Sequence, residues 1–350
     1  MKPWKTILGM GGAAALAALS AHANVAFNLI PDAGTPQYAV DAFAAAASQW
    51  SALLANNVTI NLQIGYASLS AGVIGETGNA GGEVSYATAV AALNASANSA
   101  SDRSAYAALP ADTAYPRLIN HTSDNPNGAN SATPYVDSMN RVGLTLANAR
   151  ALGLYAASDA TVDATIRFSS NFSFDFNLAD GIAPGTLDFI GMATHEIGHA
   201  LGFISGVDDI DTAGGAQPGG NFSSNLLDLF RFSDESVALG IGVTDYTADN
   251  RDKYFSVDGG VTALAAFANG VNYGDGRQAS HWRDNLDIGI MDPTAAYGEQ
   301  LAISATDLQA FDVLGYTLVP VPEPGTLALL GGGLVLFGCT RWRKATSSPC

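Results

Sequence analysis

Residues 194–203 read Thr-His-Glu-Ile-Gly-His-Ala-Leu-Gly-Phe, and the apolar positions around them recur at helical spacing. The pattern predicts a buried helix from about residue 186 to 201, capped at its start by Thr186. On this helix His195 and His199 lie one turn apart on one face, where both imidazoles can reach a single metal ion. Glu196 lies beside them, close enough to accept a proton from a water molecule on that metal. The stretch therefore predicts a metal-dependent hydrolase.

The third metal ligand does not come from this stretch itself. A catalytic zinc site normally has three protein ligands and one open position for water. Gly202 can end the helix, and in the commonest extended pattern a histidine follows it three residues later, where this chain has Ser205. The nearby carboxylates of Asp208 and Asp209 are therefore candidates for an alternative third ligand.

The five histidines of the chain narrow the choice. His22 lies in an N-terminal export segment, and His121 lies in a polar, turn-rich stretch that predicts an exposed loop. His281 remains, in the sequence Ser-His-Trp at 280–282, which is followed by Gly-Ile-Met-Asp-Pro at 289–293. Taken singly, His281 and the methionine of the second motif are each compatible with ordinary core residues.

Taken together, these motifs resemble the leishmanolysin branch of the metzincin metalloproteases. In that branch a long insertion precedes the third histidine, and a tight methionine turn follows it. The resemblance covers roughly residues 185–316, with its motifs at the two ends and a closing helix expected within 303–316. It implies zinc ligands at His195, His199 and His281, a catalytic base at Glu196, and a hydrophobic floor under the metal at Met291.

The N-terminus has the composition of a secretory signal peptide. Lys2 and Lys5 precede a short apolar stretch that finishes with the small-x-small sequence Ala-His-Ala at 21–23. Residues 1–23 are therefore predicted to be removed before Asn24.

The C-terminus, residues 321–350, resembles the PEP-CTERM sorting signal of Gram-negative bacteria. Val-Pro-Glu-Pro-Gly at 321–325 opens an uncharged stretch that reaches residue 340, and three basic residues follow at 341–344. The resemblance implies cleavage by an exosortase-type enzyme after transient membrane contact through this segment, with the basic tail left in the cytoplasm. A simple C-terminal anchor helix is the alternative. The protein is expected to cross the inner membrane and to act outside the cell or at its surface.

Charge restricts the possible partners. The chain has 15 basic and 32 acidic residues and a formal net charge of −17. This excess of negative charge argues against nucleic acid and anionic membranes as binding partners. The acidic segments 208–211 and 245–258 are candidate calcium loops, although a solvated acidic surface explains them equally well. Both cysteines, Cys339 and Cys350, lie in the C-terminal segment, so the central part of the chain must be stable without disulfides.

The central part of the chain predicts an α+β fold. The resemblance implies a metzincin-like, two-lobed zinc protease domain, with a mixed sheet and the active-site helix in residues 24–205 and an irregular, partly helical lower lobe in 206–320. Expected strands cover 24–30, 58–67 and 165–176; expected helices cover 37–54, 86–97, 144–154, 225–232 and 261–269; residues 68–82 and 119–135 are expected to be loops.

Two main functions follow. The first is a secreted zinc metalloendopeptidase that hydrolyses protein or peptide substrates with zinc-activated water and Glu196 as general base. The alternative is a non-enzymatic, zinc-stabilised protein of the cell surface or biofilm matrix. Glu196 favours the first, because a structural zinc site needs no adjacent base and usually has four protein ligands. Hydrolysis of an amide other than a peptide stays open.

Overall fold

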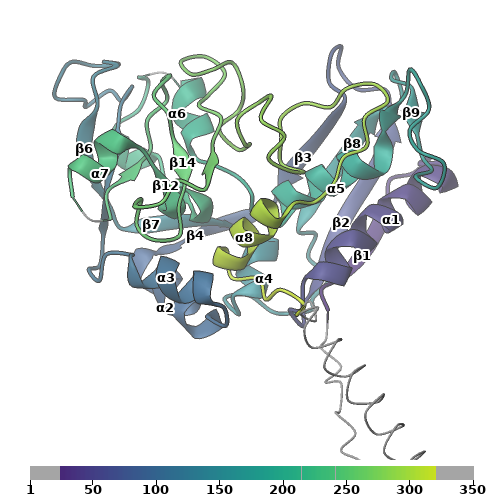
Figure 1. The fold of residues 1–350 in the computed structure, drawn as a ribbon, viewed down its shortest axis with the longest axis horizontal. Coiled ribbons are helices and arrows are strands. Elements are labelled where there is room, and N and C mark those ends of the chain that lie inside the picture. Colours follow the sequence, from purple (N-terminus) through teal and green to yellow (C-terminus); the bar gives the residue numbers. More distant parts are fainter. Residues whose placement is uncertain (1–23, 214, 241, 321–350) are drawn as a thin grey trace, which may run out of the picture.

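The computed structural model describes residues 24–320 except 214 and 241 (Figure 1). The predicted signal peptide and sorting segment lie outside the described residues. The first half of the described chain forms β1 (Ala26–Pro31), α1 (Gln37–Leu53), β2 (Thr59–Ala67), β3 (Gly75–Asn79), β4 (Gly81–Ser85), α2 (Tyr86–Ser96), α3 (Ala100–Ala107), β5 (Tyr115–Ile119), β6 (Tyr135–Met139), β7 (Arg141–Thr145) and α4 (Leu146–Ala151). The second half forms β8 (Ala164–Ser169), β9 (Phe174–Asp175), β10 (Leu187–Asp188), α5 (Phe189–Ala200), α6 (Val207–Ala213), the 3-10 helices η1 (Gly219–Asn221) and η2 (Leu226–Phe230), β11 (Ser224–Asn225), β12 (Arg231–Phe232), α7 (Asp234–Ala238), β13 (Thr244–Asp245), β14 (Tyr254–Phe255), β15 (Ala265–Ala266) and α8 (Ala305–Val313). The predicted α+β class is confirmed.

A four-stranded mixed sheet supports the helix that carries the histidine motif. Its order is β1-β2-β8-β3, with β1, β2 and β8 parallel and β3 antiparallel at the edge. The helices α1 and α5 pack against each other and against this sheet (Figure 1). The buried Trp50 of α1 donates its indole N–H to the carbonyl oxygen of Thr194 in α5, at 2.9 Å. This bond satisfies the one polar group of a fully buried side chain and fixes the two helices relative to each other.

The rest of the chain builds several small sheets beside the first. In two of them, strands from distant parts of the chain pair: β11 runs parallel to β7, and β13 runs parallel to β5. A separate three-stranded antiparallel sheet, β12-β14-β15, completes this part of the molecule (Figure 1). Residues before and after 205 therefore both contribute strands to this second group of elements.

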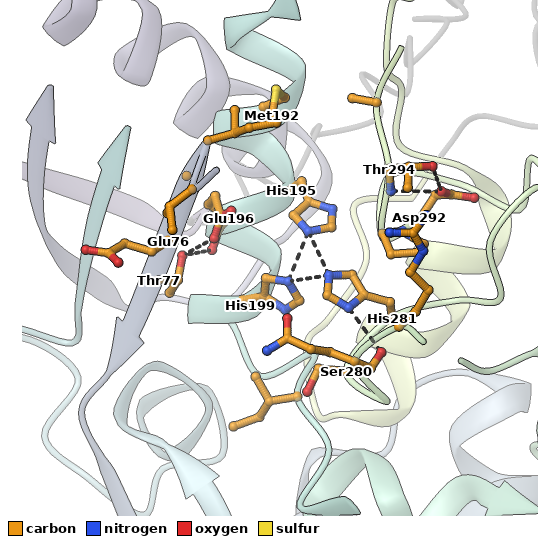
Figure 2. A pocket seen from close by; sticks show the side chains of 18 of the residues that line it. Glu76, Thr77, Met192, His195, Glu196, His199, Ser280, His281, Asp292 and Thr294 are labelled. Carbon is orange, nitrogen blue, oxygen red and sulfur yellow. Dashed lines mark hydrogen bonds between the residues drawn. The ribbon is translucent and has the colours of Figure 1, made fainter. Parts of the chain in front are cut away.

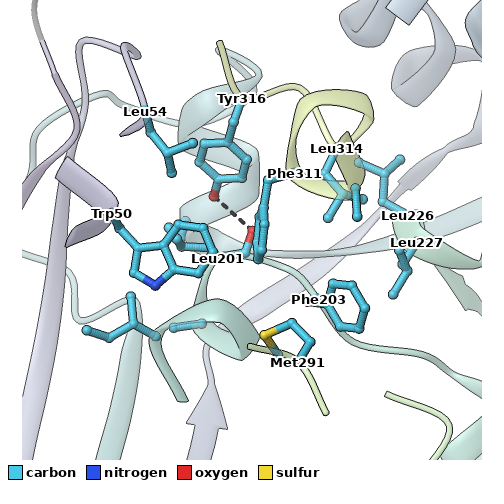
Figure 3. Packing of buried hydrophobic residues seen from close by; sticks show 14 of the residues in the cluster. Trp50, Leu54, Leu201, Phe203, Leu226, Leu227, Met291, Phe311, Leu314 and Tyr316 are labelled. Atoms are coloured by element: carbon cyan, nitrogen blue, oxygen red, sulfur yellow. Dashed lines mark hydrogen bonds between the residues drawn. The ribbon is translucent and has the colours of Figure 1, made fainter. Parts of the chain in front are cut away.

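The C-terminal helix α8 closes the core behind α5. Phe311 of α8 stacks edge-on against Trp50, with 4.5 Å between the ring centroids. Just after the helix, the buried Tyr316 donates its hydroxyl to the carbonyl oxygen of Leu201, at 2.9 Å (Figure 3). That carbonyl belongs to the last turn of α5, where helix carbonyls have no intrahelical partner. The closing helix expected within 303–316 is thus present and caps the histidine helix.

Both ends of the described chain meet at the C-terminal end of α1. The backbone N–H of Val25 donates to the carbonyl of Leu54 at 3.0 Å, and that of Val319 donates to the carbonyl of Leu53 at 2.8 Å. The first and last described segments therefore lie close together. Within residues 24–320, no helix is both long and apolar enough to cross a bilayer.

Two expectations about secondary structure are wrong, and two are only partly confirmed. The strand expected at 165–176 is divided into β8 and β9. The segment 68–82 is not all loop, because β3 and the first residues of β4 lie in it. The segment 261–269 forms no helix in the structure, which has the short strand β15 there. The segment 225–232 is a short 3-10 helix followed by β12. The helix α3 was not expected at all, although Ser99 and Asp102 form a complete capping box at its start.

Candidate metal centre

The histidine helix α5 begins two residues later than the sequence pattern indicated. Its cap is Asp188, whose carboxylate accepts the backbone N–H of Gly191 at 2.8 Å. Thr186, the expected cap, instead donates its hydroxyl to the carbonyl of Ala183. The buried Asp188 also accepts the backbone N–H of Leu301 at 3.1 Å, so it ties the start of α5 to the segment that precedes α8. A carboxylate at this end also complements the helix dipole.

The end of α5 has the turn predicted from Gly202. This residue has a φ of +114°, which costs a glycine nothing and a residue with a side chain a strained backbone. The backbone N–H of Phe203 returns to the carbonyl of Gly198 at 3.1 Å and closes the helix. The same turn brings the carbonyl of Phe203 under the ring of His199, where it accepts from Nδ1 at 2.8 Å.

Three histidine side chains converge on one point (Figure 2). Between their Nε2 atoms, the distances are 3.0 Å for His195–His199, 3.2 Å for His199–His281 and 3.2 Å for His195–His281. Two of the rings come from α5, and the third comes from a loop more than 80 residues away in the sequence. The structure therefore brings together the three residues that the sequence resemblance implied as metal ligands.

The opposite ring nitrogens show which tautomer each imidazole adopts. Nδ1 of His195 lies 2.7 Å from the carbonyl oxygen of Ile290, and Nδ1 of His281 lies 3.2 Å from that of Gln278. With the contact of His199 to Phe203, all three Nδ1 atoms face carbonyl oxygens. A carbonyl oxygen only accepts, so each Nδ1 must carry the proton and each neutral Nε2 must present a lone pair. The three lone pairs point at one another.

Burial favours the neutral form of two of these rings, His199 and His281. Desolvation lowers the pKa of His199 to about 3, and the neighbouring His195 acts in the same direction. Desolvation also lowers the pKa of His281 well below its ordinary range, with smaller contributions from His199 and His195. The neutral form is the one that binds a metal.

The donor set fits a tetrahedral metal ion. Nitrogen ligands at 2.0–2.1 Å in a tetrahedron lie about 3.3 Å apart, close to the observed separations of the Nε2 atoms. In the described part of the chain, His195, His199 and His281 form the one group of His, Cys, Asp or Glu side chains close enough together to hold an ion. Three neutral imidazoles are a donor set suited to Zn²⁺.

Glu196 lies on the same helix and opens onto the same space. Its Oε2 accepts the hydroxyl of Thr77 at 2.5 Å, and the same hydroxyl lies 3.2 Å from the carbonyl of Glu196 (Figure 2). Desolvation raises the pKa of Glu196, while His195 and the Thr77 hydroxyl act in the opposite direction. Thr77 lies on the edge strand β3, so the sheet itself orients this carboxylate. Local sequence could not have identified Thr77, because it is 119 residues from its partner.

The histidines and Glu196 line a cleft of about 680 Å³. One wall is the edge strand β3 with the turn before it, residues 72–77 and 79. The opposite wall comes from residues 277, 278, 280 and 281 and from 292–295, on either side of the methionine-containing turn. A cleft of this size, open along a strand edge, accommodates several residues of an extended chain.

Met291 is fully buried next to α5 and belongs to the main core (Figure 3). A Cβ placed on Gly198 would come within 2.4 Å of its sulfur, so the glycine of the histidine motif is what lets this turn approach the helix. The turn is held by Asp307 of α8, which accepts the backbone N–H groups of Ile290 and Met291 at 2.8 and 3.3 Å. Asp307 also accepts the indole N–H of Trp282 at 2.8 Å. Sequence reasoning missed this residue.

The alternative third ligands are not at the histidine cluster. Asp208 accepts backbone N–H groups of Ala279 and Ser280, and Asp209 is exposed on α6. The segment 208–211 is helical, and Asp211 accepts the backbone N–H groups of Asn272 and Tyr273.

The second proposed calcium segment, 245–258, also uses its carboxylates on protein groups. Asp249 pairs with Arg251 and Lys253, and Asp258 accepts hydroxyl groups of Ser256 and Thr262. These contacts argue against both calcium loops.

His121 was expected in an exposed loop and is instead buried. Its ring stacks on Tyr273 with 3.8 Å between centroids, and its Nδ1 lies 3.0 Å from the amide oxygen of Asn130. The polar residues around it satisfy one another, so a turn-rich composition did not mean exposure. His121 takes no part in the metal cluster.

Comparison with known proteins identifies only the C-terminal segment. Residues 320–344 match the family described as the PEP-CTERM protein-sorting motif. Such motifs mark exported proteins of Gram-negative bacteria and are recognised by exosortase-type enzymes, so the expected sorting signal is confirmed. No curated protein and no solved structure matches the chain.

Proposed function

We propose that this protein is an exported zinc-dependent endopeptidase with a metzincin-like catalytic domain. The observation that carries the proposal is the convergence of three neutral Nε2 lone pairs at 3.0–3.2 Å, each fixed by a carbonyl oxygen behind its ring. Three lone pairs in this arrangement repel one another unless a cation lies between them. The adjacent Glu196 supports a catalytic rather than a structural site.

Bound zinc would polarise the scissile carbonyl and lower the pKa of a water molecule to about 7. Glu196 then accepts the proton of the attacking water and delivers it to the leaving amine. Its raised pKa suits both tasks, because a carboxylate with a pKa nearer neutrality takes and returns a proton more readily. Thr77 holds one oxygen of Glu196 toward β3.

The edge strand β3 supports an extended peptide as substrate. It is the end strand of its sheet, antiparallel to β8, and its residues 75–77 and 79 line the cleft. A peptide added along such an edge receives main-chain hydrogen bonds at regular intervals. These bonds would fix the register of the substrate while the opposite wall selects side chains.

Peptide cleavage by the purified, zinc-loaded protein tests the proposal. The wild type should cleave members of a peptide library, and Glu196→Gln should keep its zinc while losing about 10²–10⁴-fold in rate. Glu235→Gln, which removes an exposed carboxylate on α7, serves as the matched control and should cleave as the wild type does. Equal cleavage by Glu196→Gln would contradict the assigned base. A wild type that holds zinc and cleaves no peptide would favour the matrix-protein alternative.

A further inference from the structure

His281 reaches the metal centre on an irregular segment, unlike the other two histidines. His195 and His199 are fixed by the helix α5, whereas residues 270–281 contain no helix or strand. The Nδ1 of His281 bonds to Gln278 within the same segment, at 3.2 Å. That bond orients the ring within its own loop but does not place the loop. The carbonyl oxygen of His281 also accepts the backbone N–H of Ala268 at 3.0 Å, which ties the segment to the residues after β15. A further contact ties it to the chain that follows α5.

Asp208 makes that contact from the first turn of α6. One carboxylate oxygen accepts the backbone N–H of Ala279 at 2.6 Å, and the other accepts the backbone N–H and the hydroxyl of Ser280 at 3.1 and 2.5 Å. Two of these donors belong to the residue directly before His281. Asp208 thus fixes the backbone from which the third ligand projects.

Ser280 extends the link back to the histidine helix. Its hydroxyl oxygen accepts the backbone N–H of Ser205 at 2.8 Å while its proton goes to Asp208. Ser205 lies a few residues after the end of α5, and Asp208 follows at the start of α6. The chain leaving His199 and the chain entering His281 are therefore joined through one serine hydroxyl and one carboxylate (Figure 2 shows Ser280 beside His281).

We propose that Asp208 is a positioning residue of the metal centre, which together with Ser280 holds His281 at the distance from His195 and His199 that a metal ion requires. The inference rests on the metal centre of the proposed function. It makes Asp208 a residue that orients a metal ligand, and not a ligand itself.

The chemistry of the three donors explains why a carboxylate is needed. Each donor is an N–H or O–H group, so only a side chain with two accepting oxygens satisfies them all. In Asp208→Asn, one oxygen is replaced by an NH₂ group that faces a donor, and at least one bond is lost. The segment then loses its anchor to the chain that follows α5, while the three histidines themselves stay intact.

Asp211 provides a matched control on the same helix. It is a buried carboxylate that accepts two backbone N–H groups, those of Asn272 and Tyr273, both at 2.8 Å. The contact is of the same kind, but it holds the start of the loop instead of the residues next to His281. Asp211→Asn therefore measures the loss of stability that follows when a buried carboxylate anchor is removed and the position of His281 is unchanged.

Cobalt binding by the full chain tests the inference. Co²⁺ is titrated into metal-free wild type, Asp208→Asn and Asp211→Asn; its visible absorption reports ligand geometry, and melting of the metal-free proteins reports the fold. Asp208→Asn should bind Co²⁺ about 10–100-fold more weakly, with an altered spectrum, as when other groups that orient metal ligands are removed. Asp211→Asn should bind within about twofold of the wild type even if it melts earlier.

A milder variant covers the case in which Asp208→Asn does not fold. Ser280→Ala removes the hydroxyl bridge and leaves both backbone bonds to Asp208, and it should weaken Co²⁺ binding in the same direction by a smaller factor. Unchanged affinity in the folded variants, or an equal loss in Asp208→Asn and Asp211→Asn, would overturn the positioning role and leave the metal centre standing. A wild type that binds no Co²⁺ would overturn the metal centre itself.

Discussion

The histidine rings are oriented before any metal arrives. Carbonyl oxygens of Ile290, Phe203 and Gln278 hold the three Nδ1 atoms, and each comes from a different part of the backbone. The entropic cost of ordering the ligands is therefore incurred during folding and not during metal binding. Loss of one ring should then remove a large share of the affinity.

His281→Ala should lose metal while the fold survives, because the ring lies at the wall of the cleft. We expect the affinity for zinc to fall by more than the 10–100-fold that is typical when a residue that orients the ligands is replaced. His121→Ala, which removes the buried histidine outside the cluster, should keep one zinc per chain. Metal content after dialysis against a weak chelator measures both. Full retention of zinc by His281→Ala would show that the third ligand is another residue.

The residues of the centre differ in how far sequence could reveal them. His195, Glu196 and His199 share one helical turn, so their spacing alone predicted the site. His281 followed from the census of histidines and from the motifs around it. Asp208 was named only as an alternative ligand, and Thr77 was not named at all. Their contacts could not be predicted, because each acts on a segment brought near only by the fold, 71 or more residues away.

At the scale of elements, the approach of the methionine turn to α5 sets the shape of the site. Gly198 and Met291 are in direct contact, and Phe311 of α8 lies behind them. Any side chain at Gly198 must displace a fully buried methionine from a close-packed core.

Gly198→Ala should destabilise the protein in spite of the better helix propensity of alanine. Overpacking costs about 1–3 kcal/mol, and the gain in propensity returns about 1 kcal/mol, which leaves a net loss of up to about 2 kcal/mol. Urea unfolding of Gly198→Ala and of the same change in a Met291→Ala background measures the coupling. The cost should shrink or reverse when Met291 is truncated. Equal costs in the two backgrounds would show that the two residues do not compete for space.

Periodicity predicted the long elements and failed for the short ones. The expected helix at 37–54 and strand at 58–67 match α1 and β2 closely, because their apolar positions repeat over many residues. β3 was missed because its glycines have low strand propensity, and pairing with β8 stabilises it instead. In 261–269 the buried Phe267 and Ala268 lie on an irregular path around β15 while Val261 is exposed, so the apolar spacing only imitated that of a helix.

At the scale of the whole molecule, the acidic chain depends on a few buried ion pairs. Asp249 contacts Arg251 and the fully buried Lys253 at 2.9 and 2.8 Å. Burial alone would raise the pKa of Asp249, but Lys253 and Arg251 outweigh it and hold the pKa at about 2. An acid whose pKa is lowered by folding stabilises the protein above its unfolded pKa of about 4, and this stability is lost as pH falls toward 2.

Asp249→Asn should therefore cost stability at pH 7 and cost much less near pH 2. Removing one partner of a buried pair typically destabilises by about 3–5 kcal/mol, because the other charge stays buried. The free energies of unfolding of wild type and variant, measured between pH 7 and pH 2, should converge as the pH falls. A difference in the free energy of unfolding that is the same at every pH would mean that the ion pairs of Asp249 do not stabilise the protein.

A bound metal would connect two parts of the molecule that are distant in sequence. His281 lies 82 residues from His199, so an ion shared between them should stabilise the whole fold. Zinc at 100 times its dissociation constant should add about 2.7 kcal/mol, seen as a higher melting temperature that EDTA reverses. The same zinc should leave the melting temperature of His281→Ala nearly unchanged. A shift of equal size in that variant would place the binding site elsewhere.

The most direct test is a crystal structure of the zinc-loaded protein with anomalous scattering recorded at the zinc edge. We expect one strong peak 2.0–2.1 Å from the Nε2 atoms of His195, His199 and His281, with a water molecule as the fourth ligand, as in catalytic zinc sites. A peak bound by a fourth protein side chain would identify a structural site and contradict the peptidase. No peak between the three rings would contradict the metal centre altogether.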